Sequence, residues 1–247
     1  MPLWELAAGF AILLLAGTIK GLVGLGLPTV SIALMSLVIS LPEAMAVLVL
    51  PTIFTNVWQG AVGGNFRTIL RRQWPLILPL MAALYVTMWL VGQKGPRWAL
   101  LVLGVVLTLY GAMGLMRIRL RVSKALEKPL APAIGVVSGF IAAMVGVPVV
   151  PLMPYLQALD IRPAEIVQTL GIVLCATSFT LAASLINFGL FDGPRALVSA
   201  GAVVPSIAGM WLGQRIRAGL SIEQFRVAVF TVLGAMGLYT VVSHLLW

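Results

Sequence analysis

Charge is the scarcest property of this sequence. Only 9% of its 247 residues are Asp, Glu, Lys or Arg, whereas a soluble domain carries about a quarter. Histidine and cysteine each occur once, as His244 and Cys175, which excludes a disulfide framework and a Cys-based metal site. Walker loops, Rossmann fingerprints, His-rich metal spacings and Ser/His/Asp sets are also missing. We therefore predict no enzyme activity and no cofactor.

Apolar residues dominate instead: they make up 61% of the chain, and the mean hydropathy is +1.08. They fall in repeated runs of about 20 residues, the length of a membrane-spanning helix, without the alternation of barrel strands. The sequence therefore predicts an all-α polytopic membrane protein. The first run contains Glu5 and lacks a basic segment before it, so we expect it to belong to the mature fold rather than to a cleaved signal peptide.

The net charge of +9 suggests a nucleic-acid partner at first, but the placement of the charge argues against one. The basic residues lie between the apolar runs, where the positive-inside rule puts them. Their largest group lies in 117–129, which we predict to be a cytoplasmic linker. We expect no nucleic-acid partner, and a multi-pass location in the inner or plasma membrane.

The order of apolar runs occurs twice, so we predict two homologous transmembrane repeats, 1–116 and 130–247, joined by the linker. The clearest match is Thr108-x-x-Gly111-Ala112-Met113-Gly114-Leu115, which recurs from Thr231 to Leu238. The other matches are Gly26 and Pro28 with Gly146 and Pro148, Pro42 with Pro163, Asn65-Phe66 with Asn187-Phe188, and Gly92-Gln93 with Gly213-Gln214. The offset between matched residues runs from 120 to 123.

Each half begins with an apolar run that glycine and proline interrupt, at Lys20–Pro28 and at Gly146–Pro148. Glycine and proline weaken a helix, and an interrupted apolar segment with an ionisable group is typical of a transporter's binding site. We predict that each half has an interrupted helix pair, re-entrant or a hairpin of full spans, followed by three transmembrane helices. The chain would then have about 8–10 membrane segments.

The Lys and Arg residues of the loops favour opposite orientations for the two halves. If each half crosses the membrane an even number of times, the two sides receive nine and six of these residues. An odd number of crossings divides them twelve to three, which fits the positive-inside rule better and makes the halves an inverted repeat. We predict the inverted repeat, with parallel repeats as the alternative.

The breaks and the helices that follow them supply the predicted binding residues. The first N–H groups of a helix favour negative charge, and neutral donors bind an oxyanion without leaving a counter-charge unpaired, so the predicted ligand is a small anion. Lys20 either neutralises that anion or extends to the headgroups. Alternatively, the glycines serve helix packing and the polar side chains serve interhelical hydrogen bonds. The predicted substrate-binding residues are Lys20, Gly24, Gly26, Thr29, Asn56, Gln59, Gly146, Thr177 and Ser178, with Asn56 and Thr177 matched in the duplication.

Two acidic residues, Glu43 and Glu165, each lie within two residues of a proline that opens an apolar run. A proton carrier must be buried, whereas the first turn of a helix favours an acid through the helix dipole. We predict the first-turn role for both.

Several motifs, taken in order, carry a family resemblance. They are AGTIKGLVGLG at 16–26, Pro42-Glu43-Ala44, Ser138-Gly139-Phe140, Gly146-Val147-Pro148 and YLQAL at 155–159. Together they resemble the TauE/SafE sulfite exporter family over essentially the whole chain, although Val147 stands where that family commonly has glycine. The resemblance implies an inner-membrane permease for sulfur-containing or organic anions, such as sulfite, sulfonates or carboxylates.

From these observations we predict a secondary transporter of such an anion, working by alternating access at a midplane site between the repeats. The alternatives are a non-transporting membrane scaffold or accessory subunit, and an anion channel. The expected partners are the small anionic substrate, a coupling proton or other ion, and the lipid bilayer; a homodimer is left open.

Overall fold

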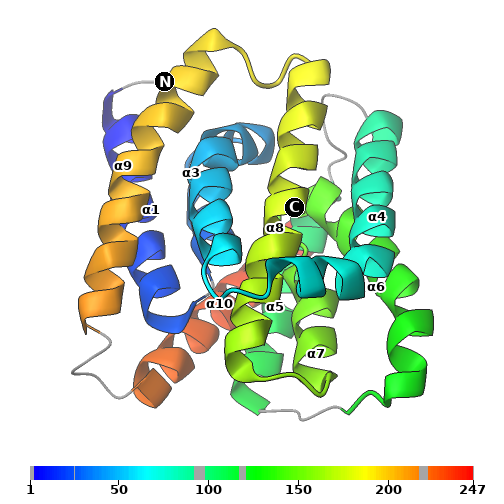
Figure 1. Cartoon of the computed structure of the whole chain (residues 1–247). Helices are drawn as coiled ribbons and strands as arrows, with labels where there is room; N and C mark the ends of the chain where they lie inside the picture. Colours follow the sequence, from blue (N-terminus) through cyan, green and yellow to red (C-terminus); the bar gives the residue numbers. More distant parts are fainter. Residues whose placement is uncertain (1–2, 25, 92–97, 117–120, 217–221, 247) are drawn as a thin grey trace. The chain divides into compact units, whose positions relative to one another are not determined.

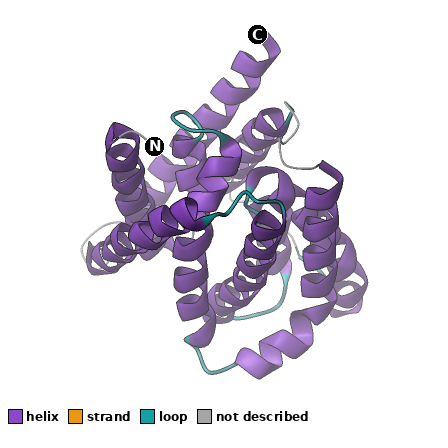
Figure 2. Ribbon diagram, turned by 90° about the horizontal axis from the view of Figure 1, so that it is seen from above, coloured by secondary structure: helices purple, strands orange, loops and turns teal. Residues whose placement is uncertain are grey.

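The structure is a computed structural model that describes residues 3–24, 26–91, 98–116, 121–216 and 222–246. These residues form ten helices and no strand (Figures 1 and 2). The helices are α1 (Leu3–Val23), α2 (Leu27–Met35), α3 (Leu41–Ala61), α4 (Phe66–Val91), α5 (Ala99–Met116), α6 (Lys124–Val145), α7 (Val149–Ala158), α8 (Pro163–Asn187), α9 (Gly193–Ile216) and α10 (Ile222–Leu246). Seven of them, α1, α3, α4, α5, α6, α8 and α9, are long and apolar enough to cross a membrane. The predicted all-α membrane class is confirmed.

Two helices are too short to span. Helices α2 and α7 have nine and ten residues, so each is about 15 Å long, half the thickness of the hydrocarbon core. This length excludes a hairpin of two full helical spans, because each interrupted pair combines one long helix with one short helix. The order of a long helix, a short helix and three long helices occurs twice, as predicted.

The helix ends correct the register of the duplication at the breaks. Helix α1 ends at Val23 and α6 ends at Val145, which places the halves 122 residues apart rather than 120. Gly24, with a φ of 82°, is therefore the counterpart of Gly146, with a φ of 78°. The glycines align in this way because glycine adopts the left-handed conformation after a helix without the strain of a Cβ. The same offset makes Ser178, rather than Thr177, the counterpart of Asn56.

The described residues include only part of the predicted linker. Helix α6 begins at Lys124, so the second half of 117–129 is helical. Residues 117–120 lie outside the described residues, as does the predicted Gly92-Gln93 match. The basic loop residues counted for the orientation of the two halves are also only partly described, since the described residues do not include Lys94, Arg97 and Arg217.

The chain forms two compact units, which are described separately. Unit 1 consists of Met1–Pro51, Gly95–Arg117 and Leu190–Trp247, and unit 2 of Thr52–Lys94 and Ile118–Gly189. Each unit thus draws helices from both halves of the sequence, and α3 passes from unit 1 to unit 2 after Pro51. The boundaries of the sequence repeats stay a prediction.

In unit 1, α1 packs along α9 through glycines that bring the two backbones together. A Cβ on Gly17 would collide with the Ser206 carbonyl, and a Cβ on Gly21 with the Met210 carbonyl. Because the residue numbers rise together, the two helices are parallel. Figure 1 shows them side by side, in blue and orange.

Helices α5 and α10, also in unit 1, pack in the opposite sense. A Cβ on Gly104 would lie 3.0 Å from the Gly237 carbonyl oxygen, one on Gly111 would lie 2.5 Å from the Gly234 Cα, and one on Gly114 would collide with the Phe230 ring. The numbers rise on α5 while they fall on α10, so the helices are antiparallel. The duplicated glycine motif therefore packs against its own copy.

Unit 2 repeats both arrangements. Helix α6 packs parallel to α4, because a Cβ on Gly135 would collide with the Leu76 carbonyl and one on Gly139 with the Leu80 carbonyl. The part of α3 in this unit is antiparallel to α8: Asn56 bonds to Ser178, Gly60 lies against Gly171, and the Asn65 side chain, just past the helix, lies 3.5 Å from Glu165.

A proline inside α3 is compensated by a serine of α9, within unit 1. Pro51 has no N–H to give to the carbonyl of Val47, four residues earlier. The Ser199 hydroxyl donates to that carbonyl at 3.0 Å and accepts from the Leu50 N–H at 3.0 Å. Ser199 is fully buried, so it satisfies backbone groups that lipid could not.

Candidate functional site

The first break, in unit 1, is a glycine turn that leaves the start of α2 without a side-chain cap. Gly24 and Gly26 have φ values of 82° and 113°, and Gly26 is the N-cap residue of α2. A Cβ added to Gly26 would meet only side chains, and the nearest would be the Ile19 side chain, at 3.1 Å. Gly26 therefore permits the turn, whereas Gly17 and Gly21 permit close helix packing. The two interpretations of this glycine-rich stretch, a turn and helix packing, thus apply to different glycines.

Lys20 lies in the last turn of α1, beside this break. The Gly24 N–H donates to its carbonyl oxygen at 2.7 Å, and the residue is only 4% exposed. A lysine that extended to the headgroups would keep its ammonium group exposed, so the burial rules out that alternative. A buried ammonium group requires polar or negative partners.

Thr29, in the first turn of α2, carries a buried hydroxyl with no hydrogen-bond partner among the described residues. It is 3% exposed, and helical side chains lean toward the N-terminus, which places the hydroxyl over the turn at the break. The hydroxyls of Thr18, Thr108 and Thr177 instead donate to the carbonyl four residues earlier. An unsatisfied buried hydroxyl costs about 1–3 kcal/mol, so this position suits a polar ligand.

The second break, in unit 2, has the same turn without these polar groups. Gly146 ends α6 with a φ of 78°, and α7 begins after Pro148, again without a side-chain cap. At the offset of 122 residues, the counterpart of Lys20 is Ala142 and the counterpart of Thr29 is Pro151. The cation and the unpartnered hydroxyl are therefore features of the first break, an asymmetry that sequence reasoning missed.

In unit 2, the structure brings Asn56 and Ser178 together. The Asn56 Nδ2 donates to the Ser178 Oγ at 3.2 Å, and both side chains are buried. The Ser178 and Thr177 hydroxyls donate to the carbonyls of Leu174 and Val173 in their own helix. The Asn56–Ser178 pair joins counterpart positions of the two halves.

Gln59 takes part in a reciprocal pair of bonds between α3 and α8. Its Nε2 donates to the Val167 carbonyl oxygen at 3.0 Å, while the Gln168 Nε2 donates to the Gly60 carbonyl oxygen at 3.1 Å. These bonds hold the two helices together, so interhelical bonding accounts for this part of the predicted set.

Glu43 and Glu165 both act at the start of a helix. Glu43 Oε2 accepts from the Ser40 N–H and hydroxyl at 3.2 and 2.6 Å. Glu165 accepts from the Arg162 N–H at 3.4 Å and from its guanidinium at 2.6 Å. The predicted first-turn role is confirmed for both.

A cavity of 320 Å³ in unit 1 was not predicted. It is lined by Leu6, Glu43, Val47, Asp192, Pro194, Arg195 and Val198. These residues come from the first two turns of α1, α3 and α9, or from just before α9, so the three helices begin at the same end of unit 1. The sequence places Asp192 and Arg195 beside the start of an apolar run. Charged residues at such a position are equally typical of a loop without a cavity, so they carry no signal for this one.

A family model described as Sulfite exporter TauE/SafE matches residues 9–240. Searches of the curated proteins and of the solved structures found no match. Because the family model covers nearly the whole chain, the chain belongs to the sulfite exporter TauE/SafE family. The family resemblance and the multi-pass membrane class are thereby confirmed.

Proposed function

We propose that this member of the TauE/SafE family is a secondary transporter of a small anion, such as sulfite, a sulfonate or a carboxylate, and that it works by alternating access. The observation that carries the proposal is the first break, where the buried Lys20 precedes one turn of unit 1 and the uncapped start of α2 with the Thr29 hydroxyl follows it. All three are donors or positive charges. Residues 6–42 contain no Asp or Glu, so the charge of the bound anion would meet no carboxylate in this segment.

The arrangement of donors favours an oxyanion. Backbone N–H groups at a helix start, an ammonium group and a hydroxyl each give a hydrogen bond to an oxygen atom. Within unit 2, Asn56 and Ser178 are a separate buried amide and hydroxyl pair that joins counterpart positions. We assign Lys20, Gly24, Gly26 and Thr29 the binding role in unit 1; Asn56, Gln59, Gly146, Thr177 and Ser178 stay predictions.

We also propose that the halves form an inverted repeat. Counterpart helices are antiparallel within a unit, α3 with α8 in unit 2 and α5 with α10 in unit 1. A pseudo-two-fold axis along the membrane normal would make counterpart helices parallel, whereas an axis in the membrane plane makes them antiparallel. The cavity of unit 1 adds support, because its lining shows that α1 and α3 begin at the same end of the unit. The chain must therefore return through α2 to the end at which α1 began before α3 starts. A cytoplasmic linker follows from this orientation and the charge distribution.

Flux measurements test the proposal. Protein reconstituted in liposomes should accumulate labelled sulfite, or a competing sulfonate or carboxylate, with saturable kinetics that respond to an imposed ion gradient. We expect K20Q and T29V each to lower the flux at least about tenfold, because K20Q removes the positive charge and T29V removes a hydroxyl donor from a desolvated site. The control is T240V, which removes a hydroxyl bonded within α10.

Unchanged flux in both K20Q and T29V would refute the site. Non-saturable flux that ignores ion gradients would show a channel. A protein with no flux and no thermal stabilisation by any of the three anion classes would be a scaffold or an accessory subunit.

A further inference from the structure

The cavity of unit 1 has a counterpart place in unit 2, which the duplication identifies. Helices α1 and α6 correspond at the offset of 122 residues, so Glu127 is the counterpart of Glu5, Lys128 of Leu6, and Thr169, on α8, of Val47.

Helices α4 and α9 correspond at a different offset. Gly17 packs against the Ser206 carbonyl, and its counterpart Gly139 packs against the Leu80 carbonyl, so counterpart residues of α4 and α9 are 126 apart. The counterpart of Val198, which lines the cavity, is therefore Arg72.

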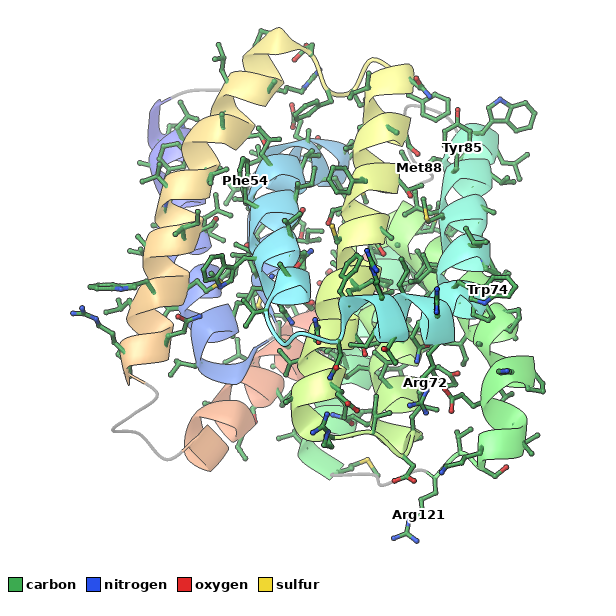
Figure 3. The ribbon with its side chains drawn as sticks, in the orientation of Figure 1. Phe54, Arg72, Trp74, Tyr85, Met88 and Arg121 are labelled. Carbon is green, nitrogen blue, oxygen red and sulfur yellow. The ribbon has the colours of Figure 1, made fainter. Side chains whose placement is uncertain are left out.

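In unit 2, an ion pair fills this place. Arg72 binds Glu127 through both Nε and Nη2, with 2.7 Å between Nη2 and Oε2. The Tyr155 hydroxyl, on α7, donates to the Glu127 carbonyl oxygen at 2.9 Å. Figure 3 shows Arg72 near the bend in the first third of α4, where Pro75 and Pro79 interrupt the helical bonding. The pair thus links α4, α6 and α7.

In unit 1, the corresponding place is open. Val198 is too short to reach across to α1, and it lines the cavity together with Leu6. Arg195 lies about one turn earlier on α9, and its ion-pair partner among the described residues is Asp192, at 3.0 Å. The same junction of helices is therefore closed by an ion pair in one unit and open as a cavity in the other.

We propose that the Arg72–Glu127 ion pair is a latch: it holds α4 against α6 and closes the access route of unit 2 that corresponds to the open cavity of unit 1. The inference rests on the proposed function, because counterpart routes in an inverted repeat lead to opposite faces of the membrane. The structure is then a state in which one route is open and the other is latched.

The chemistry of the pair suits a latch that must also release. The bidentate geometry fixes one closed arrangement. The side chains of Arg72 and Glu127 are 35% and 13% exposed, so water can solvate the charges when they separate, and the pair avoids the full desolvation cost of buried ions. Removing it should shift an equilibrium between closed and open forms rather than unfold the protein.

Thiol labelling tests the latch. In a C175A background, which removes the single cysteine, T169C places a thiol at a residue that is 2% exposed in the latched unit, and V198C places one on the open cavity, at a residue that is half-buried. A charged maleimide is added to the purified protein. We expect E127Q to speed the labelling of T169C by about fivefold to tenfold, and the charge swap R72E/E127R to restore slow labelling. V198C should label rapidly and at one rate in all backgrounds.

The labelling rates distinguish a latch from a general loosening of the fold. An unchanged T169C rate in E127Q, or a swap that fails to restore it, would overturn the latch. An equal rise at T169C and V198C would also overturn it, because that pattern means that the whole fold has loosened. The labelling measurement uses no substrate, so its result tests the latch independently of transport. Absent flux would count against the proposed function, whereas only the labelling rates decide on the latch.

Discussion

The two glycines at the centre of the α5–α10 contact should respond in opposite ways to the same substitution. Gly111 and Gly234 occupy equal positions in the duplicated motif. A Cβ on Gly111 would lie 2.5 Å from the Gly234 Cα and 2.6 Å from its N, whereas a Cβ on Gly234 would lie 3.6 Å from the Gly111 Cα, an ordinary van der Waals contact. We therefore expect G111A to destabilise the protein and G234A to be tolerated.

The magnitude follows from these distances. To accept a Cβ on Gly111, the helices must separate by about 1 Å, and overpacking of this size costs about 1–3 kcal/mol. Alanine improves the helix propensity by about 1 kcal/mol at either position, so this gain cancels between the variants. G234A should therefore be about 1–3 kcal/mol more stable than G111A, a difference in Tm of about 2–12 °C at the 2–4 °C per kcal/mol of a chain this long.

The assay is thermal unfolding in detergent, followed by the fluorescence of the seven tryptophans. Wild type, G111A and G234A are compared in the same micelle at one protein concentration. If G234A lowers the Tm as much as G111A does, or if the two values agree within about 1 °C, the packing of α5 against α10 described above is wrong.

Three further outcomes follow from the structure. S199A should lower the free energy of unfolding by about 1–3 kcal/mol, because it leaves the Val47 carbonyl and the Leu50 N–H without their partner; urea or thermal unfolding checks this, and an unchanged midpoint would contradict it. G26A should cost about 1–2 kcal/mol, since its φ of 113° strains any residue with a Cβ, and a Tm equal to that of the wild type would count against the turn. T29V should keep or raise the Tm of the ligand-free protein while it lowers flux, because it removes a hydroxyl that has no partner; a clear loss of Tm would mean that the hydroxyl has a structural role.

Much of this fold could be predicted from the sequence, because a lipid environment leaves the backbone little choice. Long apolar runs without alternation must satisfy their own hydrogen bonds, so they must be helices. The two glycine-proline breaks and the duplicated order of the helices followed from the same pattern and are confirmed. The first-turn roles of Glu43 and Glu165 could also be predicted, because a cap involves residues three apart in the chain.

Contacts between distant segments could not be predicted in this way. The sequence does not distinguish Gly111 from Gly234, and the offset of 122 at the breaks became clear only from the helix ends. The pairing of Arg72 with Glu127 joins residues 55 apart. Such contacts depend on how helices cross and on which faces meet, and the local pattern of apolar residues does not determine either.

The sequence by itself therefore determined the class, the order of the helices and the position of the breaks, since these depend on local backbone bonding and on burial in lipid. Only the tertiary structure decided which glycines pack and which turn the chain. It also separated the first break, which has Lys20 and the Thr29 hydroxyl, from a second break that has neither. The physical reason is that burial and unmet hydrogen bonding are properties of the packed molecule, and they appear only when helices from both halves surround the residue.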